Sequence, residues 1–133
     1  MTGTKEDYIN YRIAKSKEIF SDAHLLADNQ RWNSCVNRLY YSSFYLASAL
    51  LYKNGIKAET HNGVKTRLFL HFVKAGLLEK SLAKLFSHLF DWRQETDYAD
   101  FIEFDAETVE PLLPQVQRLN EKLEELIVHS SEN

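Results

Sequence analysis

Residues 31–55, RWNSCVNRLYYSSFYLASALLYKNG, decide the fold class. Apolar residues recur in this stretch every three to four positions, which is the period of one buried face of an α-helix. Gly55 can take the left-handed conformation that follows many helices, so we predict a helix from about Arg31 to Asn54. The residues expected to face inward are Trp32, Val36, Leu39, Tyr40, Ser43, Ala47, Leu50 and Leu51.

Two features of this predicted helix concern its surroundings. Its most apolar part, residues 39–52, is shorter than the ~20 residues that cross a bilayer and contains several serines, so it predicts a buried helix and no membrane span. Its small residues would let another helix, from the same chain or from a second copy, approach closely. These residues are Ser42, Ser43, Ala47, Ser48 and Ala49.

The helical period also appears on both sides of this stretch. We predict helices from Lys5 to Asn29, from His61 to Lys74 with Thr60 as N-cap and Gly76 as the stop, and from Leu82 to Tyr98 with Ser81 as N-cap. A last helix would be capped by Asp105 or Thr108, with Pro111 in its first turn and Pro114 marking a kink or a late start. The fold expected is all-α, a single domain over residues 1–133: an antiparallel up-and-down four-helix bundle with an additional short helix.

Composition places the chain among ordinary globular proteins, with 44% hydrophobic and 26% charged residues. Its single cysteine, Cys35, excludes an intramolecular disulfide, and the N-terminal stretch lacks the apolar core of a secretory signal, so we predict a reducing, cytoplasmic location. Residues 1–90 hold 13 Lys and Arg against 7 Asp and Glu, whereas residues 91–133 hold 3 against 12. This asymmetry either orients an anionic ligand or a partner, or merely lets packed helices neutralise one another.

The stretch LFDWRQETDYADF, residues 89–101, raises a functional question. The apolar line of the fourth helix leads, over the next turns, to Arg93 and Asp97, which are four residues apart and therefore neighbours on one helix face. Two interpretations stand. The pair is a structural ion pair joined by Asn37 or a tyrosine hydroxyl, or it belongs to a functional cleft.

The five histidines show no metal-ligand spacing, and no glycine-rich phosphate loop is present, so we predict neither a metal nor a cofactor. His61 follows the expected cap, where a helix N-terminus favours its neutral form, and Lys65 lies one turn on. It is either a capping and packing residue or a catalytic one. His88 precedes Arg93 by five positions and should point away from it. The rings of Tyr40, Tyr41, Phe44 and Tyr45 could stack bases of single-stranded RNA or form core.

Four short motifs together resemble the HEPN superfamily, in particular its small stand-alone prokaryotic members. They are RLYY at Arg38–Tyr41, THNGV at Thr60–Val64, HFVKAGLL at His71–Leu78 and RQETDY at Arg93–Tyr98, and the resemblance covers residues of about 31–128. It implies the four-helix bundle already expected, pairing into a homodimer, and a role in toxin–antitoxin or defence systems beside a minimal nucleotidyltransferase. Many members are metal-independent ribonucleases whose R-x(4–6)-H arginine and histidine, from two protomers, form a composite site.

This chain departs from that motif. Arg93 matches the arginine, but positions 98–100, where histidine should follow, are Tyr98, Ala99 and Asp100. A carboxylate beside an RNA phosphate repels it and is a poor general acid at neutral pH. We therefore predict a degenerate HEPN protein that partners a nucleotidyltransferase and binds nucleotide or RNA near Arg93. The alternative is a ribonuclease toxin in which His61 or another residue replaces the missing histidine.

The candidate residues follow from these observations. The catalytic candidates are Arg93, Asp97 and Tyr98, and the ligand-binding candidates are Asn37, Arg38, Tyr41, His61 and Lys65.

Overall fold

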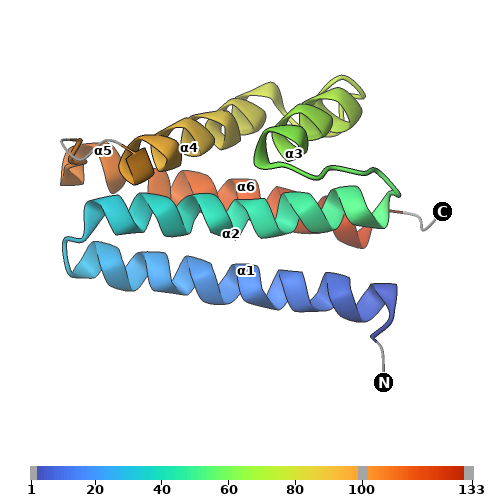
Figure 1. Cartoon of the computed structure of the whole chain (residues 1–133), viewed down its shortest axis with the longest axis horizontal. Coiled ribbons are helices and arrows are strands. Elements are labelled where there is room, and N and C mark those ends of the chain that lie inside the picture. Colours follow the sequence, from blue (N-terminus) through green and yellow to red (C-terminus); the bar gives the residue numbers. More distant parts are fainter. Residues whose placement is uncertain (1–2, 99–101, 131–133) are drawn as a thin grey trace.

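A computed structural model describes residues 3–98 and 102–130, including the backbone but not the side chain of Tyr98. All the secondary structure in these ranges is helical, which confirms the predicted fold class. Four long helices form the bundle: α1 (Lys5–Asp28), α2 (Trp32–Lys53), α4 (Lys80–Tyr98) and α6 (Leu112–Val128). In Figure 1, α1 and α4 run in one direction and α2 and α6 in the other, as the up-and-down topology requires.

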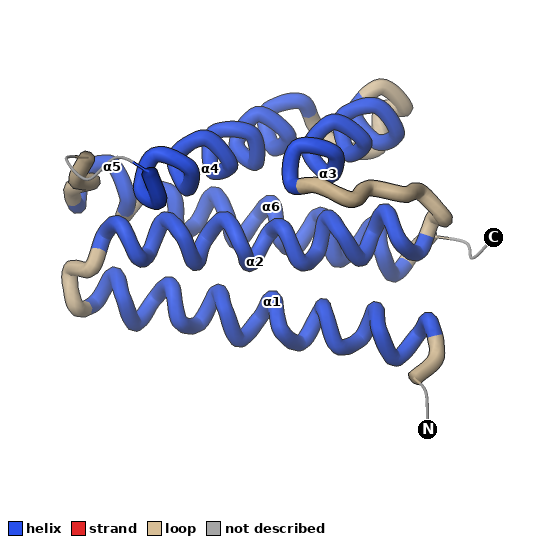
Figure 2. The backbone as a smooth tube through the Cα atoms, in the orientation of Figure 1, coloured by secondary structure: helices blue, strands red, loops and turns tan. Residues whose placement is uncertain are grey.

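Short helical segments supplement the bundle. α3 (His61–Leu68) continues into the π-helical segment η1 (Phe69–Val73), and α5 (Ala106–Val109) is a single turn before α6. The tan connections in Figure 2 are short. Gly55 and Gly76 take φ values of 72° and 77°, so both end helical segments in the left-handed conformation as predicted.

Local capping explains most of the boundaries. The Thr60 side chain accepts a hydrogen bond from the Gly63 amide at 2.8 Å, which confirms the predicted start of α3. Asp105 likewise caps, but it caps the separate turn α5, and α6 begins after Pro111 with Pro114 in its first turn. The prediction that Ser81 caps the fourth helix was wrong, because α4 already begins at Lys80.

α2 is the central helix, packed against α1, α6, α4 and α3. Its small residues Ser42 and Ser43 face α1 and α6 of the same chain: the Ser16 hydroxyl donates to the Ser42 carbonyl, and the Ser43 hydroxyl donates to Asn120 Oδ1. The close approach expected for these two residues therefore occurs within one chain. The opposite side of α2 faces α3 and α4, and the candidate site lies there.

Candidate functional site

Arg93 is the one buried cation among the described residues. It continues the apolar face of α4 that includes Phe86, Leu89 and Phe90, and it is only 9% exposed. Its Nη1 donates to Asp97 Oδ2 at 3.2 Å, so the predicted ion pair is present. The Asp97 side chain is 38% exposed, so the acid faces solvent while the cation points inward.

One donor of Arg93 has no acceptor. Its Nε is buried and makes no hydrogen bond to any described residue. A buried donor left without a partner costs about 1–3 kcal/mol, and more when the group is charged. An acceptor for this Nε must therefore come from outside the described residues.

Aromatic rings, in place of a second carboxylate, surround the guanidinium. Its Cζ lies 5.1 Å from the ring centre of Tyr40, 5.9 Å from that of Tyr41 and 5.8 Å from that of Phe90. A desolvated cation over a ring gains on the order of 2 kcal/mol without losing its N–H donors. These rings hold the charge in place and leave it able to bind an anion.

His61 reaches the same ring system from the first position of α3. Its Nδ1 lies 2.8 Å from the Tyr40 hydroxyl, and its ring stacks on Phe44 at 4.3 Å and 17°. Burial first, and the charge of Arg93 second, lower the pKa of His61, so the imidazole is neutral at pH 7. The neutral form of His61 that we predicted is therefore favoured by burial and by the charge of Arg93. Burial also raises the pKa of Tyr40, which keeps the phenol protonated.

The other predicted ligand-binding residues lie around these rings. Lys65 Nζ sits 4.4 Å from the centre of Phe90, and the Arg38 Cζ sits 5.3 Å from the centre of Tyr41. Three cations therefore surround one aromatic cluster, from α2, α3 and α4. The arrangement suits a ligand that carries both negative charge and a planar ring.

The expectation that Asn37 joins the Arg93–Asp97 pair was wrong. Asn37 Oδ1 accepts instead from Arg38, at 3.2 Å from Nε and 2.8 Å from Nη2. Asn37, Arg38 and Asp97 do meet, because they line one shallow hollow of about 280 Å³. Among the described tyrosines, no hydroxyl joins the pair either, and that of Tyr40 bonds to His61.

Some residues of the site were missed, and others cannot be placed. Tyr40 connects Arg93 to His61, and Phe90 connects Arg93 to Lys65. Neither was named as a site residue, because both have the helical period of core residues. The Tyr98 side chain, Ala99 and Asp100 lie outside the described residues. His88 stacks on Trp92 with ring centres 5.5 Å apart.

Within the described residues, no three histidine, cysteine, aspartate or glutamate side chains come together as a metal ion would require. No helix in the same ranges is long and apolar enough to span a membrane.

Comparison with known proteins adds a family and several relatives. The model of the HEPN domain matches residues 9–126. A UPF0332 protein of Thermotoga maritima is 37% identical over 123 residues, which cover 92% of this chain and 93% of that protein. A protein of Methanocaldococcus jannaschii with the provisional name of a toxin is 31% identical over 101 residues, covering 76% of this chain and 69% of its own length. A second protein of that organism with the same kind of name is 27% identical over 124 residues.

Proposed function

The chain belongs to the HEPN domain family, and we propose that it is a toxin-type member that binds the phosphate of a nucleotide or an RNA at Arg93. The observation that carries this proposal is the buried Arg93 Nε, a charged donor without an acceptor among the described residues, in a cluster of aromatic side chains. An anionic oxygen would satisfy that donor and also compensate the buried charge, which a neutral acceptor would not do.

The surrounding chemistry favours a nucleotide over a simple anion. Arginine binds phosphate with charge-assisted hydrogen bonds, and bases stack on exposed aromatic faces and on guanidinium planes. Arg93, Lys65 and Arg38 supply the positive charge, and Tyr41, which is half-buried, supplies an accessible ring. Asp97 lowers the affinity for any anion, because it competes for Arg93.

Catalysis by the family's ribonuclease motif is not part of this proposal, because the position of its histidine holds Tyr98, Ala99 or Asp100. One observation favours the alternative of a ribonuclease: Arg93 and His61 both contact Tyr40, so a histidine from α3 lies beside the arginine. The lowered pKa of His61 suits a general base. Its Nδ1 is already engaged by Tyr40 and its face by Phe44, which leaves Nε2 as the atom that could act.

We further propose that the protein forms a homodimer and pairs with a minimal nucleotidyltransferase. Membership of the HEPN family supports both. The exposed apolar side chains of Phe69, Leu70 and Leu77, at and beyond η1, offer surface that a partner could cover. Sedimentation of the chain alone tests the dimer, and calorimetric titration with a minimal nucleotidyltransferase tests the pair. A monomer, or no heat on titration, contradicts the corresponding proposal.

The binding proposal is tested with fluorescently labelled RNA and with uridine monophosphate. We expect both to bind the wild-type protein, Arg93→Ala to abolish binding, and Arg93→Lys to restore only part of it, because lysine keeps the charge but loses the paired donors. Arg118→Ala is the matched control, since Arg118 is an exposed cation on α6 that lines no hollow described here. Wild-type affinity in Arg93→Ala would contradict the proposal.

Expression of the chain alone separates binding from catalysis. If the protein is a ribonuclease, growth arrest and RNA cleavage will both be lost in Arg93→Ala and in His61→Ala. If it is a binding module, the wild-type protein will leave labelled RNA intact while still binding it. Cleavage that survives His61→Ala would assign no catalytic role to this histidine.

A further inference from the structure

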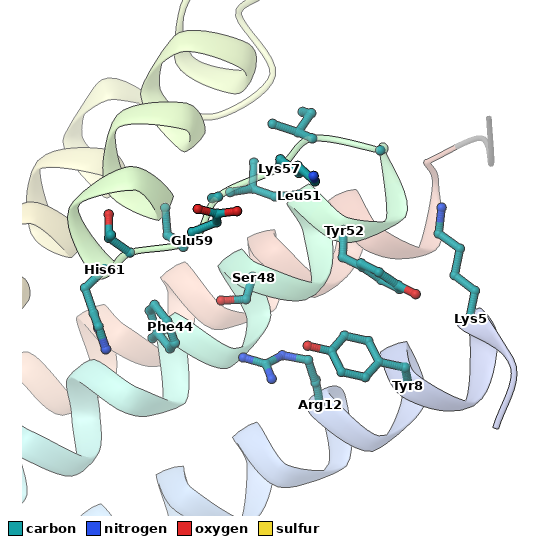
Figure 3. Close-up of a pocket in the computed structure, with 15 residues that line it drawn as sticks. Lys5, Tyr8, Arg12, Phe44, Ser48, Leu51, Tyr52, Lys57, Glu59 and His61 are labelled. Atoms are coloured by element: carbon teal, nitrogen blue, oxygen red, sulfur yellow. The ribbon is translucent and has the colours of Figure 1, made fainter. Parts of the chain in front are cut away.

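A second hollow lies beside the Arg93 site, between α1, α2 and the loop that precedes α3 (Figure 3). It encloses about 540 Å³. Three cations line it, Lys5, Arg12 and Lys57, against a single carboxylate, that of Glu59. The hollow is therefore positively charged and large enough for a nucleotide-sized group.

Two of these cations, Lys5 and Arg12, lie over rings instead of pairing with acids. The Arg12 Cζ lies 4.4 Å from the ring centre of Tyr45 and 5.3 Å from that of Tyr8, and the Lys5 Nζ lies 5.3 Å from the ring centre of Tyr52. None of the ion pairs found among the described residues involves a residue that lines this hollow. The Arg12 guanidinium bonds only weakly to the chain, with Nε 3.4 Å from the Tyr45 carbonyl oxygen. The remaining donors of these cations are available to an anion.

Exposed rings accompany these cations. Tyr8 and Tyr52 are 43% and 44% exposed although both are large aromatic side chains, and their ring centres are 4.7 Å apart. In Figure 3 they lie toward one end of the hollow, near Lys5, whereas His61 and Phe44 lie toward the other, with Ser48 and Arg12 between. Bases stack on such rings with little regard to sequence.

The two sites are continuous. His61 and Phe44, which stack on each other, line this hollow, and both rings lie within 6 Å of Tyr40, the ring that carries Arg93. The rings of Tyr40, His61 and Phe44 thus connect Arg93 on one side to Arg12 and Tyr8 on the other, so that cations stand at both ends of a row of rings. A mononucleotide would occupy only one part of this row.

We propose that the row is one binding track for single-stranded RNA, with Arg93 at one end and the hollow around Arg12 and Tyr8 as its second subsite. This inference rests on the proposed function and adds to it the class of ligand. Phosphate-binding cations beside base-stacking rings are what an unpaired strand requires, whereas the stacked bases of a duplex cannot reach such rings. The second subsite adds cations and rings from α1, whereas the cations around the Arg93 rings come from α2, α3 and α4.

The test measures the affinity of fluorescein-labelled oligouridine of about ten nucleotides, a length within the known range of single-strand sites, beside that of uridine monophosphate. Wild-type protein should bind the oligonucleotide more tightly. Tyr8→Ala should lower the affinity for the oligonucleotide by at least about fivefold, the lower end of the effect of losing one base stack. Arg12→Ala should reduce the slope of log affinity against log salt by about 0.7, the value for one phosphate contact on a single strand. Neither variant should change the affinity for the monophosphate.

Each outcome has a distinct meaning. Equal affinities of wild type, Tyr8→Ala and Arg12→Ala for the oligonucleotide would overturn the track and leave the Arg93 site intact. If the wild-type protein binds neither probe, the proposed function fails and the track fails with it. If the two variants disrupt self-association while RNA binding is unchanged, the hollow is a contact between copies and the track is wrong. Arg118→Ala serves again as the control for charge, and Tyr8, being exposed, can be replaced without loss of the fold.

Discussion

The two sides of α2 both bury polar side chains, and they satisfy them in opposite ways. Four buried side chains of the described residues are polar or charged: Ser16, Ser42 and Ser43 on the side that faces α1 and α6, and Arg93 on the side that faces α3 and α4. Ser16 donates at 2.6 Å, Ser42 donates to the Leu39 carbonyl at 2.8 Å, and Ser43 donates to Asn120 at 2.7 Å. Arg93 makes one hydrogen bond, to Asp97 at 3.2 Å, and its buried Nε has no acceptor among the described residues.

This contrast separates a structural polar group from one that is kept for a ligand. The serine–asparagine network (Ser16, Ser42, Ser43 and Asn120) is closed, because Asn120 Nδ2 also donates to the Ser42 hydroxyl at 3.0 Å. No buried side-chain atom of this network lacks a hydrogen-bond partner. Around Arg93 one buried charged donor, Nε, has no acceptor among the described residues, and such a donor lowers the stability of the free protein. A bound ligand that supplies the acceptor would remove this cost.

Arg93→Met gives the largest effect expected from this contrast. Methionine has a similar volume and needs no acceptor, so the free energy of unfolding should be unchanged or raised. RNA affinity should fall by about 150-fold, or ~3 kcal/mol, the loss of one to two charge-assisted hydrogen bonds. Thermal unfolding and RNA titration of the same sample measure both quantities. A variant that is clearly less stable than wild type would show that Arg93 is a structural residue like the serines.

Asn120→Leu tests the closed network. It leaves the Ser43 hydroxyl without its acceptor and removes a donor to Ser42, so the free energy of unfolding should fall by about 2 kcal/mol. RNA affinity should stay at the wild-type value. The double variant Ser43→Ala/Asn120→Leu should recover part of the loss, because removing both partners leaves less unsatisfied than removing one. A denaturation series of the three proteins decides this.

The helices on both sides of α2 could be predicted from local sequence, whereas details that depend on packing could not. Gly55, Gly76 and Thr60 marked real boundaries because backbone conformation and capping act within a few residues. The π-helical turn of η1 was missed, and so was the separation of α5 from α6. A single π-helical turn changes the hydrophobic period over too few residues to be recognised in the sequence. The break between α5 and α6 likewise falls within one continuous apolar pattern.

The candidate site was predictable to the same extent. The Arg93–Asp97 pair follows from spacing on one helix. For Tyr40 the sequence left base stacking and a core position open, because a buried ring that carries a cation has the same period as one that does not. Tyr40, Arg93 and His61 lie on three different helices, and only tertiary packing brings them together. Asn37 pairs with its sequence neighbour Arg38, which the spacing of Arg93 and Asp97 could not indicate.

Asp97→Asn should have a smaller effect, in the opposite direction to Arg93→Met. It removes the carboxylate that competes with RNA phosphate for Arg93, so the affinity should rise by up to about fivefold, or ~1 kcal/mol. The free energy of unfolding should change by less than about 1 kcal/mol, because Asp97 is partly exposed and screened by solvent. The same titration and unfolding measurements apply. Weaker RNA binding would mean that Asp97 orients Arg93 and does not compete with its ligand.

The smallest effect expected is a pH dependence of the free energy of unfolding that arises on the Arg93 side of α2, the open side, where His61 lies. Burial and the charge of Arg93 lower the pKa of His61 in the folded protein, whereas in the unfolded chain it returns to about 6.5. Between the two values the unfolded state binds more protons, so stability is lost as the pH falls below about 6.5 and is unaffected by this residue above it.

Unfolding curves of wild type and His61→Gln between pH 7.5 and 5 would isolate this contribution, and the difference between them should grow toward low pH. Asn120→Leu is the matched control, because the serine–asparagine network holds no titratable group and its curve should parallel that of wild type. In Arg93→Met the dependence should become shallower but persist, because Arg93 is the second cause of the shift and burial the first. If His61→Gln also parallels wild type, His61 is not desolvated against Tyr40 and Phe44, and the open side would consist of Arg93 alone.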